Sequence, residues 1–319
     1  MDAWGLTHEL GDAFTCGDAL SAGMTRGRLR TKRLEPVFHG VRMMRDDDVA
    51  TDTDPRSVER HRVLRAVRGF VPLLGRDRFF AGRTAAVLFD APIQHGDDIT
   101  VGVRSPARAP RRRGVVGVKV SAHLVSVMEH SGLPVASPAS SWAMLGSEMS
   151  VRELVLGDWF VRVPRTAHGA PAPELRQATP EQLRRVIAAG QRPGISRLRA
   201  AVELVRVGSA SPLETEYRLD AAAEGLPEPE LDVEIRDPQG RLIGITEVAY
   251  RDYRTLVEIE GDHHRTDRRQ WIRDIEKYNA YAALGWDVVR LTSPHIRASR
   301  RGVAMVRDAL VRHGWRPGR

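Results

Sequence analysis

The chain has 319 residues, 42% of them hydrophobic and 28% charged, and this length predicts two or three domains of a globular protein rather than a disordered or fibrous chain. A single cysteine, Cys16, excludes an internal disulfide and a cysteine-rich zinc site. No apolar run approaches the roughly 18 residues of a bilayer span. The N-terminus also lacks a basic start followed by an apolar run, so we expect a cytoplasmic protein without a membrane partner.

The net charge of +8 is unevenly distributed along the chain. Residues 51–199 hold 23 basic and 13 acidic side chains, whereas residues 200–284 hold 11 basic and 18 acidic ones. A basic surface beside an acidic cluster suits a protein that binds a polyanion in one place and divalent cations in another. The alternative is that an arginine-rich composition makes the surface basic without any binding role. Composition does not decide between the two.

The first expected unit is a small DNA-binding head over residues 14–45. Thr15 and Thr25 are good N-caps for two short helices, and Pro36 is expected to end the second one. Val37 to Met43 is expected to form a strand of a wing hairpin. The stretch FTCGDALSAGMTRGRLRTKRLEPVFHGVRM resembles the winged helix-turn-helix of type IV abortive-infection antitoxins. The expected DNA contacts are those of the second helix, namely Thr25, Arg26, Arg28, Arg30, Lys32 and Arg33.

An acidic linker, residues 46–54, is expected to separate this head from a middle region. Helices are expected over 57–71 and 82–89, and strands over 99–103 and 115–120. Between these strands lies a cluster of five arginines that either clamps phosphates or is a solvated loop, and the residues leave both open. No P-loop, dinucleotide glycine fingerprint or nucleophile elbow occurs in the chain.

The acidic segment begins with a helix and a hairpin. Ser211-Pro212-Leu213-Glu214 is a helix start, in which Glu214 completes a capping box or serves a site. Alternation over 231–235 predicts a strand, a turn follows at 237–240, and the return strand carries Glu247 near its end.

The next strand carries paired carboxylates. Glu258 and Glu260 are two residues apart and therefore share a face of the strand, where their repulsion favours a bound cation such as Mg²⁺. A helix is expected to follow, with Trp271, Ile275, Tyr278 and Ala282 forming one buried stripe. A buried strand over 286–291 and a final helix over 303–311 complete the order.

The segments SPLETEYRL, ITEVAY, VEIEGDHHRTDRRQW and GWDVVRLT resemble the endonuclease-like domain related to very-short-patch-repair enzymes, within the PD-(D/E)XK nuclease superfamily. The resemblance implies a restriction-endonuclease-like α/β/α sandwich with a mixed sheet and metal-dependent hydrolysis of phosphodiesters. By position it implies a helix-borne acid at Glu214, metal ligands at Glu247, Glu258 and Glu260, and a catalytic histidine at His264 or its neighbour His263. Arg265, Arg268 and Arg269 would anchor flanking phosphates.

Two positions depart from that pattern. Glu247 stands where the family usually has Asp, and Glu260 stands where it usually has Lys. The resemblance therefore implies the fold more strongly than the activity.

We therefore expect an α/β multidomain protein. Its parts are a winged helix-turn-helix head at 1–50, an antitoxin-like α+β middle domain at 55–200 and the nuclease-like domain at 205–319. The expected function is an endonuclease that uses Mg²⁺ or Mn²⁺ on DNA, in repair or phage defence, near the nucleoid. The alternatives are a non-catalytic, antitoxin-like DNA-binding regulator with a cognate toxin-like partner, and a nuclease of RNA.

Overall fold

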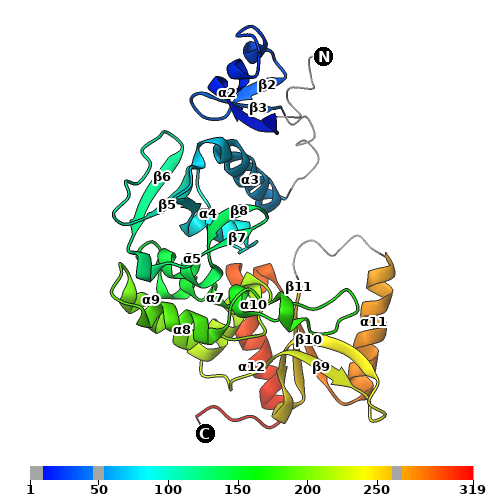
Figure 1. Ribbon diagram of the computed structural model, residues 1–319. Helices are drawn as coiled ribbons and strands as arrows, with labels where there is room; N and C mark the ends of the chain where they lie inside the picture. Colours follow the sequence, from blue (N-terminus) through cyan, green and yellow to red (C-terminus); the bar gives the residue numbers. More distant parts are fainter. Residues whose placement is uncertain (1–9, 46–53, 261–267, 319) are drawn as a thin grey trace. The chain divides into compact units, whose positions relative to one another are not determined.

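A computed structural model describes residues 10–45, 54–260 and 268–318 (Figure 1). Three sheets lie in the described part, together with helices throughout, so the chain is a mixed α/β protein. It divides into two compact units. Unit 1 comprises residues 1–148 and 185–195, and unit 2 comprises residues 149–184 and 196–319. The three domains expected from the sequence stay a prediction.

The head in unit 1 is built on a three-stranded antiparallel sheet. Its strands are β1 (Ala13–Thr15), β2 (Leu34–Pro36) and β3 (Val41–Met44), in the order β1-β3-β2. Thr15 caps helix α2 (Cys16–Ser21), as expected, by accepting from the Asp18 N–H. Phe14, Ala19, Met24, Leu29 and Leu34 form its core.

The second helix expected in the head is shorter and tighter than predicted. Thr25 does accept from the Arg28 N–H at 3.3 Å, but the turn that it begins is the 3₁₀ helix η1 (Arg28–Arg30). Thr31 is already extended, because Leu34–Pro36 must reach β3 to complete the sheet. Strand pairing therefore ends the helix before Pro36 is reached.

The rest of unit 1 surrounds a five-stranded mixed sheet of order β6-β5-β4-β8-β7. Its strands are β4 (Arg78–Phe80), β5 (Ile99–Arg104), β6 (Val115–Val120), β7 (Val127–His130) and β8 (Leu133–Ala136). The helices are α3 (Pro55–Leu74), α4 (Gly82–Leu88), η2 (Ala122–Leu124), α5 (Pro138–Met144) and η3 (Leu145–Ser147). The helices and strands expected from the sequence over 57–71, 82–89, 99–103 and 115–120 are confirmed. Asp54 caps α3 by accepting from the Ser57 N–H.

Unit 2 contains a four-stranded sheet of order β12-β11-β10-β9. Strands β9 (Glu230–Arg236), β10 (Leu242–Tyr250) and β11 (Thr255–Glu260) are antiparallel neighbours, whereas β12 (Asp287–Thr292) runs parallel to β11. The sheet is therefore mixed. The antiparallel pairs follow from short turns, and the parallel pair follows from the helical crossover between β11 and β12.

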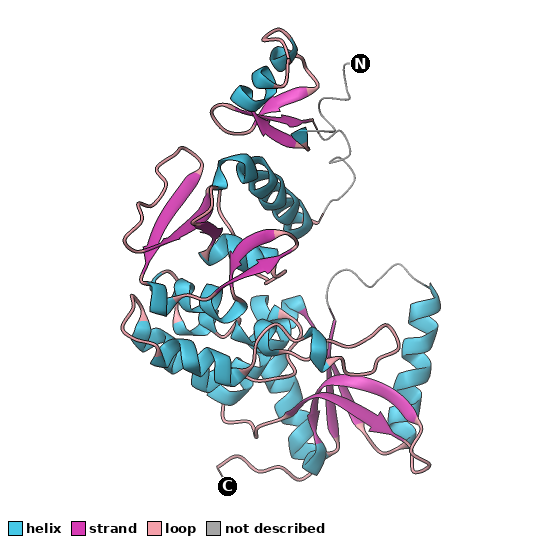
Figure 2. Cartoon of the chain, in the orientation of Figure 1, coloured by secondary structure: helices cyan, strands magenta, loops and turns pink. Residues whose placement is uncertain are grey.

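Helices cover both faces of this sheet (Figure 2). On one face, Val248, Val257 and Val289 pack with residues of α10 (Pro212–Ala223) and α12 (Gly302–Arg312). On the other face, Ala249 and Leu256 pack with Tyr281 of α11 (Arg268–Ala283). Alternate strand residues point to opposite faces, so this packing assigns each side chain of β10 and β11 to one face.

Short helices complete unit 2. They are α6 (Val151–Leu154), α7 (Gly157–Val161), η4 (Pro173–Leu175), α9 (Ile195–Leu204), η5 (Arg251–Tyr253) and the π-helical η7 (Pro294–Ala298), while α8 (Pro180–Ala188) spans the division between the units. In the part of the chain that the structure describes, no helix combines the length and apolar character needed to cross a bilayer.

Candidate metal centre

The predicted acidic residues Glu247 and Glu258 lie where β10 and β11 stop pairing. The backbone ladder is paired at Val248 and Val257, and Glu247 and Glu258 are the next two residues in that register. Beyond the ladder, side chains bridge the strands: the Ile259 N–H donates to Glu247 Oε2 at 3.4 Å, and the Thr246 hydroxyl contacts the Val257 carbonyl at 3.4 Å. The end of the ladder therefore leaves two carboxylates at one position of the sheet.

Burial and neighbouring charge act together on Glu247. Desolvation, followed by the negative charges of Glu258 and Glu214, raises the pKa of its carboxyl to about 8. Glu247 therefore carries a proton at neutral pH unless a cation compensates its charge.

Glu258 is 4% exposed, and its two oxygens have different surroundings. Oε2 accepts from Lys277 Nζ at 2.6 Å. Oε1 is buried and has no hydrogen-bond partner among the described residues. A buried carboxylate oxygen without a partner is costly, so Oε1 is the atom of this site at which a ligand would gain most.

Lys277 belongs to this acidic cluster, and the sequence reasoning missed it. It lies on α11, and its Nζ is 4.9 Å from the ring centroid of Tyr278 and 5.8 Å from that of Tyr281. The prediction of a buried stripe that includes Ile275 and Ala282 is wrong in part. Ile275 is 39% exposed and Ala282 is exposed, whereas Tyr281 is fully buried. Apolar periodicity failed here because the inward face of this helix carries a lysine opposite the carboxylates.

A glycine on β10 lets α11 approach the sheet this closely. A Cβ at Gly244 would lie 2.4 Å from Tyr281 Oη and 2.8 Å from Lys277 Cδ. Tyr281 Oη is buried without a hydrogen-bond partner among the described residues, and burial raises the pKa of this phenol. The glycine thus provides the space in which the Lys277 side chain reaches Glu258.

Glu260 shares the Glu258 side of the strand, as predicted, but has its own cation. Arg290 of β12 forms an ion pair with it, with Nε 2.6 Å from Oε1. The Arg290 guanidinium also lies 4.9 Å from the ring centroid of Tyr278. The repulsion expected between the two carboxylates is therefore offset by two cations of the chain itself, Lys277 and Arg290.

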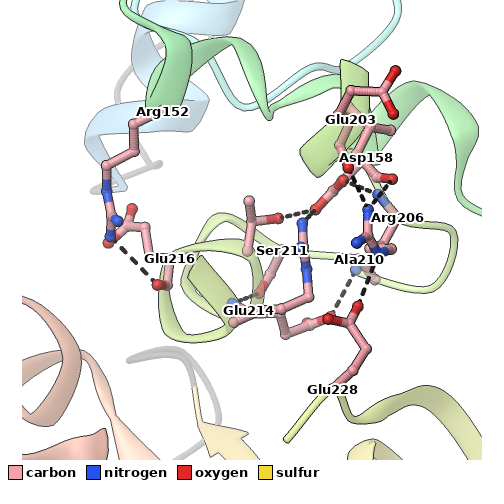
Figure 3. Close-up of polar contacts among 12 residues, drawn as sticks. Arg152, Asp158, Glu203, Arg206, Ala210, Ser211, Glu214, Glu216 and Glu228 are labelled. Atoms are coloured by element: carbon pink, nitrogen blue, oxygen red, sulfur yellow. Dashed lines mark hydrogen bonds and ion pairs between the residues drawn. The ribbon is translucent and has the colours of Figure 1, made fainter. Parts of the chain in front are cut away.

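Glu214 caps the start of its helix, whereas its role in a site stays a prediction. The Ser211 hydroxyl accepts from the Glu214 N–H at 3.3 Å, and Glu214 Oε2 accepts from the Ala210 N–H at 2.7 Å, which caps α10 (Figure 3). The side chain is also buried, which raises the pKa of its carboxyl. Because its charge contributes to the raised pKa of Glu247, it lies within electrostatic range of that carboxyl.

A buried ion pair holds the helix that carries Glu214. Asp158 of α7 is 1% exposed and accepts from Arg218 Nη2 at 2.7 Å, from the Thr215 hydroxyl at 2.8 Å and from the Arg206 N–H at 2.7 Å. Figure 3 shows Asp158 and Arg206 beside the start of α10. Thr215 and Arg218 both belong to α10, so Asp158 anchors the helix that carries Glu214.

The remaining predicted residues are not part of this cluster in the described structure. His263, His264 and Arg265 lie outside the described residues, and Arg268 and Arg269 are the first two residues of α11. In the head, the Thr25 hydroxyl accepts from the Arg28 N–H, and Arg28 is partly buried. The exposed residues are Arg26, Arg30, Lys32 and Arg33. Across residues 10–45, 54–260 and 268–318, no three His, Cys, Asp or Glu side chains are gathered as a preformed metal site.

Comparison with known proteins adds relatives but no function. No protein-family model matches the chain. Two uncharacterized proteins of Mycobacterium tuberculosis, Rv2248 and MT2308, are each 27% identical to it over 233 residues, which cover 70% of this chain and 82% of the relative. The chain is therefore similar to proteins whose names state no activity.

Proposed function

We propose that the protein is a metal-dependent endonuclease that hydrolyses phosphodiester bonds of DNA, with its site at Glu247, Glu258 and Lys277. One observation carries the proposal. A buried carboxylate, Glu258, has a lysine on one oxygen and no hydrogen-bond partner among the described residues on the other, next to a second carboxyl group. Perturbed, partly compensated acids of this kind are typical of sites that bind a cation and a phosphate.

The residues fit a hard divalent cation. Mg²⁺ is commonly held by one or two carboxylates together with water and substrate phosphates, so two protein ligands suffice. Glu258 Oε1 and the Glu247 carboxyl would be those ligands, and Glu260 would remain with Arg290. A Mg²⁺ or Mn²⁺ ion bound there would polarise the scissile phosphate and acidify a water molecule.

The protein groups have separate tasks in this proposal. Glu247 would give up its proton when it served as a ligand, and Lys277 would hold Glu258 in place and present positive charge to the phosphate. His263 or His264 is proposed to accept the proton of the attacking water. Water adds to phosphorus and one P–O ester bond breaks, which gives a phosphomonoester and a free hydroxyl.

Cleavage assays test the proposal. Supercoiled, linear, mismatched and single-stranded DNA would be incubated with Mg²⁺ or Mn²⁺ and the wild type, Glu258→Gln, Lys277→Met or Glu230→Gln. We expect Glu258→Gln to lose at least about 100-fold in rate, since even outer-shell changes at metal sites cost about 10–100-fold. Glu230→Gln is the matched control, because Glu230 is exposed on the same sheet and pairs with Arg251.

A second candidate is a non-catalytic, antitoxin-like DNA-binding regulator with a toxin-like partner. Specific observations favour it: Glu258 and Glu260 are already paired with Lys277 and Arg290, and the described residues hold no preformed set of three metal ligands. This candidate predicts DNA binding that divalent cations do not change, and no cleavage of any DNA form. Preferential cleavage of RNA in a competition assay would instead identify an RNA nuclease.

A further inference from the structure

A strip of unpaired cations lies along one edge of the large sheet in unit 1. Residues 99–128 contain six Lys and Arg side chains and no Asp or Glu. We call them the basic strip: Arg104, Arg108, Arg111, Arg112, Arg113 and Lys119. All six are exposed, and in the part of the chain that the structure describes none forms an ion pair.

Cations of unit 2 show the opposite arrangement. Exposed arginines such as Arg236, Arg251 and Arg312 each have a carboxylate partner, namely Glu234, Glu230 and Asp287. The protein therefore neutralises these surface cations in one unit and leaves six neighbouring ones uncompensated in the other. Like charges held close together repel, so a surface of this kind is suited to an anionic partner.

The topology spreads the strip along the sheet. Strands β5 and β6 are parallel, from Ile99 opposite Val115 to Arg104 opposite Val120, so the loop between them must return along their whole length. This loop lies against the edge strand β6. The close approach is seen at Gly117 of β6, where a Cβ would be 2.1 Å from the carbonyl oxygen of Pro110 in the loop. Arg104 and Lys119 consequently lie at one end of the strand pair, and the cluster of Arg111, Arg112 and Arg113 at the other.

That length identifies the kind of anion. Five residue steps of β-strand span about 17 Å, whereas one free phosphate needs cations that converge on a point. A DNA duplex presents phosphates every ~3.4 Å along each strand, so a strip of about 17 Å matches about five base pairs. Arginine is also the side chain best suited to phosphate contacts.

The strip continues toward the head. Arg112 Nη1 donates to the His39 carbonyl at 2.7 Å, in the turn between β2 and β3. Arg42, just beyond that turn, donates to the carbonyl of Leu29 in η1. The turn of the head thus lies between the strip and the cations around η1.

We infer that the basic strip is a binding surface for the phosphate backbone of duplex DNA, which adds to the head a second contact that reads no sequence. The choice of DNA rests on the proposed function, whereas the presence of a polyanion site rests on the strip alone. Binding and cleavage are separable, so the two proposals fail independently.

Charge-removing variants of the full chain test this inference. The strip variant changes Arg104, Arg108, Arg111 and Arg113 to Gln. The control, which alters the net charge equally, changes to Gln the paired arginines Arg236, Arg251 and Arg312 together with Arg241, an exposed residue paired with Asp237. Fluorescence anisotropy would measure binding to a random-sequence duplex of about 30 base pairs, which is long enough to hold several phosphate contacts. The titrations would be run at several salt concentrations in EDTA, where no metal-dependent cleavage occurs. Circular dichroism and thermal melting of each variant would check its fold.

We expect the strip variant to bind at least about tenfold more weakly at low salt and the control to bind like the wild type. The slope of log K against log salt should also become shallower by about 2–4, because each phosphate that the protein no longer neutralises removes ~0.9 from it. Equal weakening in both variants would show that net charge alone matters. Unchanged binding of the strip variant would show that DNA does not contact the basic strip. Either result would overturn the inference. Tighter binding of single- or double-stranded RNA than of DNA would overturn the choice of DNA, and loss of cleavage by Glu258→Gln with unchanged binding would concern only the nuclease site.

Discussion

Glu247 and Glu258 are the same residue type, yet the fold gives their carboxyl groups different surroundings. Glu258 has Lys277 at 2.6 Å. Glu247 accepts a long contact from the Ile259 N–H at 3.4 Å and lies near the negative charges of Glu258 and Glu214. Lys277 supplies one positive charge for the two carboxyl groups, and a proton on Glu247 takes the place of a second one.

This difference predicts a pH-dependent stability. The pKa of Glu247 rises from 4.5 to about 8 on folding. Its favourable contribution is therefore complete below 4.5 and is lost as pH rises through 8. In EDTA, the free energy of unfolding of the wild type should fall relative to that of Glu247→Gln across this window, by up to about 1.4 kcal/mol per pH unit. Urea unfolding of both proteins at several pH values measures this difference in the free energy of unfolding. If the free energies of the two proteins changed in parallel with pH, the raised pKa of Glu247 would be contradicted.

The same proton links pH to metal binding. Because Glu247 must lose it to become a ligand, the affinity for Mn²⁺ should rise by about tenfold per pH unit up to the raised pKa. Glu247→Gln should bind Mn²⁺ weakly and without this dependence. Calorimetric titration at matched ionic strength measures both quantities. An affinity in the wild type that does not change with pH would show that Glu247 is not a ligand.

At the scale of elements, the position of α10 depends on one buried ion pair more than on its cap. Asp158 receives three hydrogen bonds, two of them from side chains of α10. Burial raises the pKa of the Asp158 carboxyl, although the charge of Arg218 opposes that rise. The pair is thus costly to bury and more costly to break.

Asp158→Ala should therefore lower the free energy of unfolding by about 3–5 kcal/mol, because it leaves Arg218 buried without a counter-charge. Asp158→Ala with Arg218→Met should recover much of that loss, since no buried charge remains. The matched control is Asp220→Ala on the same helix, whose pair with Arg152 is partly exposed and is worth less than about 1 kcal/mol. Urea unfolding of all four proteins separates these effects. A loss in Asp158→Ala no larger than in Asp220→Ala would refute the role of the buried pair.

At the scale of the whole molecule, residues 149–184 and 196–204 belong to the compact unit that contains the acidic site. Asp158 lies in this part, and its partner Arg218 lies in α10. The polypeptide that supports the site therefore begins before the domain boundary expected near residue 205.

Fragments test this directly. A fragment of residues 149–319 should fold cooperatively, whereas a fragment of residues 205–319 should be less stable or insoluble, because Arg218 would be buried without Asp158. Thermal unfolding and limited proteolysis of the two fragments compare them. Equal stability of the two fragments would show that residues 149–204 contribute nothing to the fold of the C-terminal sheet.

The sequence by itself determined the local elements of this protein and which side chains share a face. The caps at Thr15 and Ser211 and the alternation along 257–260 appear in the structure as expected, and the strand expected over 286–291 is found at 287–292. Each of these features depends on neighbours only a few residues away. The length of η1 and the inward face of α11 were mispredicted. Strand pairing with β3 decided the first, and close packing over Gly244 decided the second.

Only the tertiary structure decided the partners of the acidic residues. Lys277 is 19 residues from Glu258, Arg290 is 30 residues from Glu260, and Asp158 is 60 residues from Arg218. Local periodicity carries no information on such pairs, because they form only when strand register and helix packing bring distant segments together. The sequence thus indicated where the carboxylates lie, and the packing of α11 and β12 determined which of their oxygens remain available.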